Sequence, residues 1–291
     1  MPDALTRFMF EHAPVKGGIV QLDEVWKTVQ GHADYPAPLK KALGELLAAA
    51  ALLTSNIKFD GSLVLQIQGN GPVRLIVVEA TSDKTLRATA KWEGEVPNSE
   101  ALSDLVGEGR FVMTLDQSAV GKQNYQGIVP LEGDTVAETL TRYMQSSEQL
   151  DTRVYLASNG NRVAGMLLQR MPEQSTTDAD GWNRAAILAD TLKPDELLQL
   201  LPGDILTRLF HEETLRRFEQ EPMRFACTCS REKVGGMLKM LGENEVGSIL
   251  EEQGKVEINC EFCDRQYHFD PVDVALLFSV GHSGEAPPTR H

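Results

Sequence analysis

Two short stretches, FACTCSREKV (residues 225–234) and INCEFCDRQY (residues 258–267), contain all four cysteines of this 291-residue chain. The first stretch holds Cys227 and Cys229 as a C-x-C pair, and the second holds Cys260 and Cys263 as a C-x-x-C pair. The 30 residues between the pairs leave room for two helices that fold back and bring the pairs together. Four converging thiolates with no open position form a closed tetrahedral site. The spacing therefore predicts one Zn²⁺ per chain, held by these four residues.

The residues around the two pairs predict a small module. The C-x-C pair lies in an extended stretch, where residues two apart point to the same side. Ser230 can cap a helix that Gly242 ends, and a second helix is expected to end near Gly254. Residues 255–269 then predict a strand, a turn that holds the C-x-x-C pair, and a return strand. A module this small has little core, so metal binding is expected to supply much of its folding free energy, on the order of 10–16 kcal/mol.

The four cysteines also allow other interpretations. A purely structural zinc site is the commonest use of such a set. A thioredoxin-type active site agrees less well with the sequence, because C-E-F-C lies between two predicted strands rather than between a strand and a helix. His268 could replace one cysteine as a ligand, although a packed surface histidine is commoner. The chain shows no Walker loop, Rossmann glycine pattern or nucleophile elbow, so no catalytic residue is predicted and an enzyme is not expected.

Each pair is also close enough in sequence to oxidise internally, Cys227 with Cys229 and Cys260 with Cys263. Two residues along a strand span about 6.6 Å, at the upper edge of the ~4.4–6.8 Å between Cα atoms that a disulfide accepts. The first disulfide would therefore deform its strand and remove two metal ligands. Four nearby cations are expected to favour the thiolates: Arg224, Arg231, Lys233 and Arg265. An oxidant could thus eject the metal and unfold the module.

Residues 1–172 predict one mixed α+β domain. Helical character is expected around residues 22–29, 38–53 and 136–145. Strands are expected at residues 57–67, 73–79, 86–92 and 111–115, with a hairpin over 152–169 that turns at Asn159-Gly160. Runs of strands separate from the helices, without regular βαβ alternation, favour an α+β fold over a doubly wound one.

The composition changes after Pro172. Residues 173–181, EQSTTDADG, are polar and rich in turn-forming residues, and a leucine-rich segment follows. Pro194 and Pro202 divide that segment into short helices, with Asp204 as the expected N-cap of the last. Helices this short depend on packing against something else. The segment is either an ordinary helical subdomain or one that folds only while its neighbours hold it.

The net charge of −14 and the pI near 4.9 argue against general nucleic-acid binding, because such a surface repels phosphate backbones. The N-terminus has no basic segment that leads into an apolar one, so no signal peptide is expected. The longest unbroken apolar run, Leu46 to Leu53, is far shorter than the ~18 residues needed to span a bilayer. We therefore expect a cytoplasmic protein with no membrane partner, whose thiols are metal ligands or redox groups rather than structural disulfides.

The cysteine stretches closely resemble the zinc module of the 33-kilodalton heat-shock protein family, the redox-regulated holdase chaperones. The likeness extends through most of the chain. It includes YPAPLKKALGELLAAAALL (35–53), MTLDQ (113–117), NYQGIVPLEGDTVAETLTRYMQSSEQL (124–150) and AGMLLQRMP (164–172).

This resemblance implies an α+β chaperone that binds unfolding client proteins without ATP under oxidative and heat stress. The reduced, inactive state would hold zinc on Cys227, Cys229, Cys260 and Cys263. Oxidation would join Cys227 to Cys229 and Cys260 to Cys263, release the zinc, unfold the module with the adjoining linker, and lead to a homodimer.

The resemblance also implies three regions. These are an N-terminal substrate-binding and dimerisation domain at residues 1–172, a metastable helical linker at 173–226, and a zinc-binding redox switch at 227–291. Two alternatives from other classes stay open: a thiol-disulfide oxidoreductase, and a translation or nucleic-acid factor with structural zinc.

Overall fold

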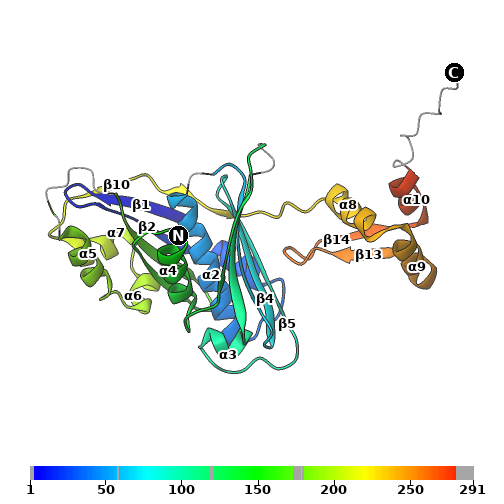
Figure 1. Ribbon diagram of the computed structural model, residues 1–291, viewed down its shortest axis with the longest axis horizontal. Coiled ribbons are helices and arrows are strands. Elements are labelled where there is room, and N and C mark those ends of the chain that lie inside the picture. Colours follow the sequence, from blue (N-terminus) through cyan, green and yellow to red (C-terminus); the bar gives the residue numbers. More distant parts are fainter. Residues whose placement is uncertain (1–2, 58, 118–120, 173–177, 179, 280–291) are drawn as a thin grey trace, which may run out of the picture. The chain divides into compact units, whose positions relative to one another are not determined.

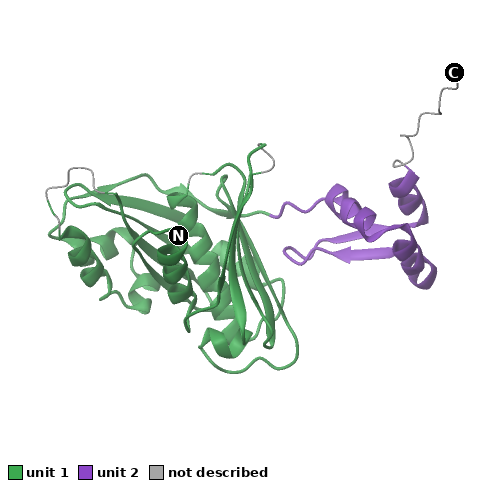
Figure 2. Ribbon diagram, in the orientation of Figure 1, with its two compact units in different colours: residues 1–226 green, residues 227–291 purple. Residues whose placement is uncertain are grey.

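The structure, a computed structural model, describes residues 3–57, 59–117, 121–172, 178 and 180–279 (Figure 1). It divides into two compact units, residues 1–226 and 227–291 (Figure 2). The first unit contains two six-stranded sheets, and the second contains a two-stranded sheet with helices around it. The predicted α+β class is confirmed.

The first sheet, sheet A, joins distant parts of the sequence. Its central strands are antiparallel: β1 (Ala4–Phe10), β2 (Val15–Leu22), β9 (Val163–Arg170) and β8 (Thr152–Ser158). Two short strands, β10 (Leu215–Arg217) and β11 (Glu221–Pro222), pair with the outer edge of β1. The predicted hairpin is β8–β9, and the Asn159 side chain closes its turn by accepting from the backbone N–H groups of Asn161 and Arg162.

The second sheet, sheet B, is built mainly from consecutive hairpins. Its strands are β3 (Ser62–Gly69), β4 (Val73–Thr81), β5 (Thr85–Trp92), β6 (Gly109–Asp116), β7 (Tyr125–Pro130) and β12 (Arg224–Phe225). Their order is β12-β5-β4-β3-β6-β7, antiparallel except for β12, which runs parallel to β5. The strands predicted at 73–79, 86–92 and 111–115 are confirmed. The strand predicted from residue 57 starts too early, because the preceding helix runs to Asn56 and β3 begins at Ser62.

Helix α2 (Ala37–Asn56) packs between the two sheets and contacts strands of both. Its apolar run from Leu46 to Leu53 is completely buried, because a helix between two sheets has no face left for water. The other helices predicted here are also present, as α1 (Glu24–Gln30) and α4 (Val136–Ser146), and a short α3 (Leu102–Val106) was not predicted.

Three further helices cover the face of sheet A that points away from α2: α5 (Gly181–Ala189), α6 (Pro194–Gln199) and α7 (Pro202–Phe210). The two prolines divide the segment into short helices, as predicted, and each lies in a first helical turn, where a missing N–H costs nothing. The expectation that Asp204 caps the last helix is wrong. Leu201 is its N-cap, and Asp204 lies in the first turn.

The second unit follows the predicted order of elements. Helices α8 (Arg231–Leu241) and α9 (Glu243–Gln253) precede the antiparallel strands β13 (Val256–Asn259) and β14 (Gln266–Phe269), and an unpredicted α10 (Pro271–Ser279) follows. Ser230 Oγ accepts from the Lys233 N–H and so caps α8, and Gly254 ends α9 with a left-handed φ of 76°. Among the described residues, the core of this unit has seven buried apolar side chains: Val234, Leu238, Val246, Val256, Tyr267, Phe269 and Val274.

Within the described part of the chain, no helix combines the length and the apolar character needed to cross a membrane.

Candidate metal centre

The four cysteines meet in one cluster in the second unit. Their Sγ atoms all lie within 4.8 Å of one another. The distance is 3.6 Å between the sulfurs of Cys227 and Cys260 and 3.4 Å between those of Cys229 and Cys263. Four sulfurs placed ~2.3 Å from a central Zn²⁺ in a tetrahedron would be ~3.8 Å apart. The cluster therefore has the ligand number and the dimensions of a Cys₄ metal site, and the four cysteines could hold a metal ion.

The backbone around each pair fixes these positions. Cys227 and Cys229 lie in the extended segment before α8. Cys260 and Cys263 lie in the tight turn between β13 and β14, where the Cys260 carbonyl accepts from the N–H groups of Cys263 (3.2 Å) and Asp264 (2.7 Å). Asp264 takes a left-handed φ of 53°, which Asp tolerates better than most residues. The turn thus presents both thiols on the same side.

Tyr267 is a contributor that the sequence analysis missed. Its hydroxyl donates a hydrogen bond to Cys229 Sγ at 3.1 Å, and its ring is buried in the core of the module. Hydrogen bonds from a second layer of residues orient metal ligands and stabilise thiolate charge. The alternation of buried residues along β14, with Tyr267 and Phe269 on one face, is the signal that could have identified it.

The charges around the thiols agree with the prediction only in part: Arg265 interacts electrostatically with Cys229 and Cys263. Burial raises the pKa of Cys260 and of Cys263, so without a metal both thiols favour the neutral form. Arg231, expected to favour thiolates, instead pairs with Asp273 (2.7 Å), donates to the His268 carbonyl and lies over the Phe269 ring. A bound cation would supply the positive charge that thiolate ligands require.

His268 is not part of the cluster. Its Nδ1 lies 3.1 Å from Glu257 Oε1 on the neighbouring strand, and the metal-binding group comprises the four cysteines alone among the described residues. The Cys₄ alternative is therefore favoured over a site with one histidine.

None of the four cysteines is in a disulfide. Because the sulfurs form a compact cluster, distance does not select a pairing. The contacts at 3.4 and 3.6 Å each join a cysteine of the C-x-C pair to one of the C-x-x-C pair. The pairing implied by the family resemblance therefore stays a prediction.

Comparison with known proteins gives the family. The family model described as Hsp33 protein matches residues 3–270. The 33 kDa chaperonin of Methylobacillus flagellatus is 53% identical over 280 residues, covering 96% of this chain and 95% of that protein. That of Chromobacterium violaceum is 51% identical over 290 residues, covering 99% and 98%. Among solved structures, the 33 kDa chaperonin (heat shock protein 33 homolog) of Thermotoga maritima is similar with a TM-score of 0.84 at 25% identity, covering 97% of this chain and 99% of that one.

A helix enclosed by two sheets, followed by a four-cysteine module and matched over nearly its whole length to 33 kDa chaperonins, defines the class of protein as a heat-shock chaperone. The chain belongs to the Hsp33 family.

Proposed function

We propose that the protein is a redox-regulated, ATP-independent holdase that binds unfolding client proteins during oxidative and heat stress. It is inactive while its thiols are reduced and hold zinc. The observation that carries the proposal is the apolar face of sheet A that α5, α6 and α7 cover.

This covered face is large and aromatic. It includes Phe8, Phe10, Ile19, Met166 and Leu168 from the strands. The helices bury apolar residues of their own against it: Ala185, Ala189, Leu197, Ile205, Leu206, Leu209 and Phe210. While they are packed together, neither surface is available. Once the helices detach, both become the kind of exposed apolar patch that binds partly unfolded polypeptides.

The four-cysteine cluster supports zinc as the resident metal. A closed set of four thiolates suits Zn²⁺, which has no redox chemistry of its own, so an oxidant acts on the sulfurs. The module has a core of only seven buried apolar side chains among its described residues, so loss of the metal removes a main source of its stability.

The switching reaction is the oxidation of two thiol pairs. In each pair, the two cysteine thiols form one S–S bond and give up two electrons and two protons. One hydrogen peroxide molecule takes up these electrons and protons and becomes two waters. From the family resemblance we assign the bonds to Cys227 with Cys229 and to Cys260 with Cys263. Each disulfide removes two ligands from the zinc, and the module and the linker over residues 173–226 then lose their folded form.

The other assignments rest on the same resemblance. Residues 1–172 bind clients and form the homodimer of the active state, residues 227–291 form the redox switch, and the protein acts in the cytoplasm. The acidic surface, with a net charge of −14, supports client proteins rather than nucleic acid as partners.

The test uses reduced, zinc-loaded protein that is exposed to peroxide at elevated temperature. Zinc release and suppression of the aggregation of a thermally unfolding client are followed in one sample. The proposal expects both to appear together and to reverse when reductant and zinc are restored. If zinc is released but the client protein still aggregates, the cluster has only a structural role.

A further inference from the structure

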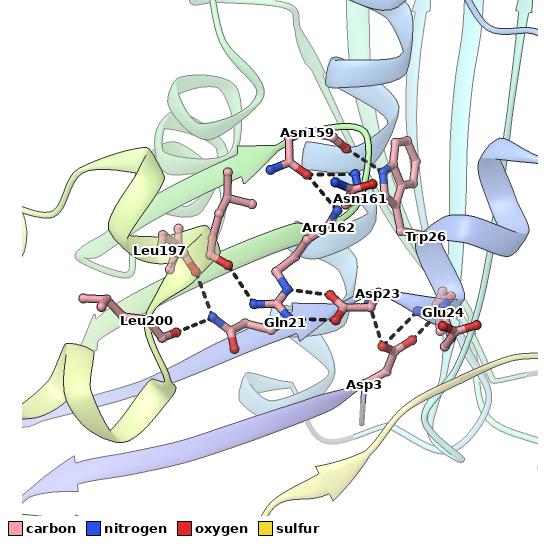
Figure 3. Close-up of polar contacts among 12 residues, drawn as sticks. Asp3, Gln21, Asp23, Glu24, Trp26, Asn159, Asn161, Arg162, Leu197 and Leu200 are labelled. Carbon is pink, nitrogen blue, oxygen red and sulfur yellow. Dashed lines mark hydrogen bonds and ion pairs between the residues drawn. The ribbon is translucent and has the colours of Figure 1, made fainter. Parts of the chain in front are cut away.

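Helix α6 is held on sheet A by hydrogen bonds to its C-terminal end. The last carbonyls of a helix have no partner within the helix. Here, Gln21 Nε2 donates to the carbonyls of Leu197 (2.9 Å) and Leu200 (2.8 Å), and an Arg162 guanidinium N–H donates to the carbonyl of Leu198 (2.7 Å) (Figure 3). Two side chains of the first unit therefore supply three hydrogen bonds to the carbonyls at the C-terminal end of α6. We call Gln21 and Arg162 the clasp.

Gln21 is well placed for this role. It lies on β2 opposite Ala4 and Ala164, two small residues that leave its side chain room to reach α6. It is only 6% exposed, so its amide protons have little access to water and their bonds to the helix are not easily exchanged for others.

Arg162 is held by an anchored carboxylate. Its guanidinium makes two hydrogen bonds to Asp23, at 2.5 and 2.6 Å, which leaves a third N–H directed to α6. The backbone N–H of Asp23 in turn donates to the buried Asp3 carboxylate, which also accepts from the N–H of Val25 (Figure 3). This chain of bonds holds the arginine in place without any contact from α6.

We infer that Gln21 and Arg162 are positioning residues that set how readily the covering helices leave sheet A. The inference rests on the proposed holdase function and adds a second control to it. The thiols would determine when the second unit unfolds, while the clasp would determine how firmly the apolar face stays covered. Weakening the clasp should uncover the face in protein that is still reduced and zinc-loaded.

The test exchanges Gln21 for glutamate, which keeps the shape of the side chain. The Gln21→Glu side chain donates no hydrogen when it is ionised and only one when it is protonated, so it cannot satisfy both carbonyl oxygens. We expect on the order of a tenfold to hundredfold increase in the uncovered form. The matched control is Gln169→Glu, the same exchange at a residue that is equally buried in sheet A but donates to Thr152 instead of to α6.

Three properties of the reduced, zinc-loaded proteins are measured. These are bound zinc, suppression of client aggregation, and hydrogen exchange of the α6–α7 peptides compared with those of α2. For Gln21→Glu we expect zinc to be retained, clients to be protected without oxidant, and exchange to be faster in α6–α7 but unchanged in α2. The wild type and Gln169→Glu should show none of these changes. A general loss of stability would instead speed exchange in α2 as well.

Slow exchange in α6–α7 of Gln21→Glu, equal to that of the wild type, would overturn the inference. If the Gln21→Glu variant fails to fold, Arg162→Gln tests the same prediction, since it removes the bond to Leu198 and leaves Gln21 in place. The proposed function is tested separately with oxidised wild type. If that protein does not protect clients, the holdase proposal fails, while the exchange measurement still decides whether the clasp holds α6.

Discussion

The sulfur atoms of Cys229 and Cys263, 34 positions apart in the sequence, lie 3.4 Å apart in the second unit. Cys229 leads into α8, and Cys263 ends the turn after β13. The contact therefore closes a loop that contains both α8 and α9. A metal bound here would connect the start and the end of this loop, so its removal should affect the whole module.

Replacement of one ligand should demonstrate this dependence. We expect Cys260→Ser to lose tight zinc binding, to unfold the second unit and to become partly active without oxidant, because three thiolates no longer close the site. Zinc content per chain, far-ultraviolet circular dichroism and client protection measure these effects. The control is Thr228→Ser, which alters a residue between two ligands and leaves the thiols intact. An inactive, fully folded Cys260→Ser protein at heat-shock temperature would contradict the prediction.

Tyr267 should tune the metal affinity without being a ligand. Tyr267→Phe keeps the buried ring but removes the hydroxyl that donates to Cys229 Sγ. We expect zinc affinity to fall by about tenfold, at the low end of the effects seen for second-layer residues. Competition with a chromophoric chelator measures the affinity. Equal affinities of variant and wild type would show that the hydrogen bond has no influence on the thiolate.

The disulfide pairing can be read directly from tryptic peptides. Cleavage after Arg224, Arg231, Lys255 and Arg265 leaves each cysteine pair on one peptide, FACTCSR and VEINCEFCDR. If oxidation joins cysteines within each pair, both peptides appear separately, each lighter by two hydrogen atoms. If it joins Cys227 to Cys260 and Cys229 to Cys263 instead, the peptides appear joined. Mass spectrometry of the peroxide-treated protein separates these results, and we expect the first.

Glu45 on α2 gives the first unit a specific pH dependence. Burial, with a smaller contribution from the Glu100 carboxylate, raises the pKa of Glu45 from 4.5 to about 7, against the opposing effect of Lys41. The folded state therefore binds a proton more readily than the unfolded chain. Stability from this group is present at acidic pH and is lost as the pH rises from about 4.5 to about 7.

We therefore expect Glu45→Gln to unfold like the wild type near pH 4.5 and to be more stable above pH 7. The gain should be about 2 kcal/mol, allowing for the partial exposure of the group. Urea unfolding of the first unit at the two pH values measures it. The matched control is Glu95→Gln, the same exchange at an exposed position. A gain that is the same at both pH values would show that ionisation of Glu45 is not its source.

Local signals explain which elements could be predicted. Ser230 and Gly254 mark helix ends through their own backbone preferences, and the two cysteine motifs define a turn and an extended segment, so the second unit was predictable up to β14. The apolar run of α2 was equally clear. The sequence also indicated short helices after Pro194 and Pro202.

Some of the elements that were missed depend on distant partners. Strands β10, β11 and β12 are only two or three residues long and are defined by pairing with β1 and β5. Gln21 finds its acceptors 176 and 179 positions away, and a single sequence gives no sign of such a contact. The leucine-rich segment also belongs to the same compact unit as residues 1–172, a result of packing that its own periodicity could not reveal.

The pairing of Phe8 with Arg217 has a consequence for biosynthesis. A ribosome releases β1 among the first residues of the chain, but β10 emerges only after almost the whole first unit has been made. Until then the outer edge of β1 has no strand beside it, and such edges tend to pair with other chains. The nascent protein must therefore carry an open sheet edge through most of its own translation, and that edge closes only after β10 has left the ribosome.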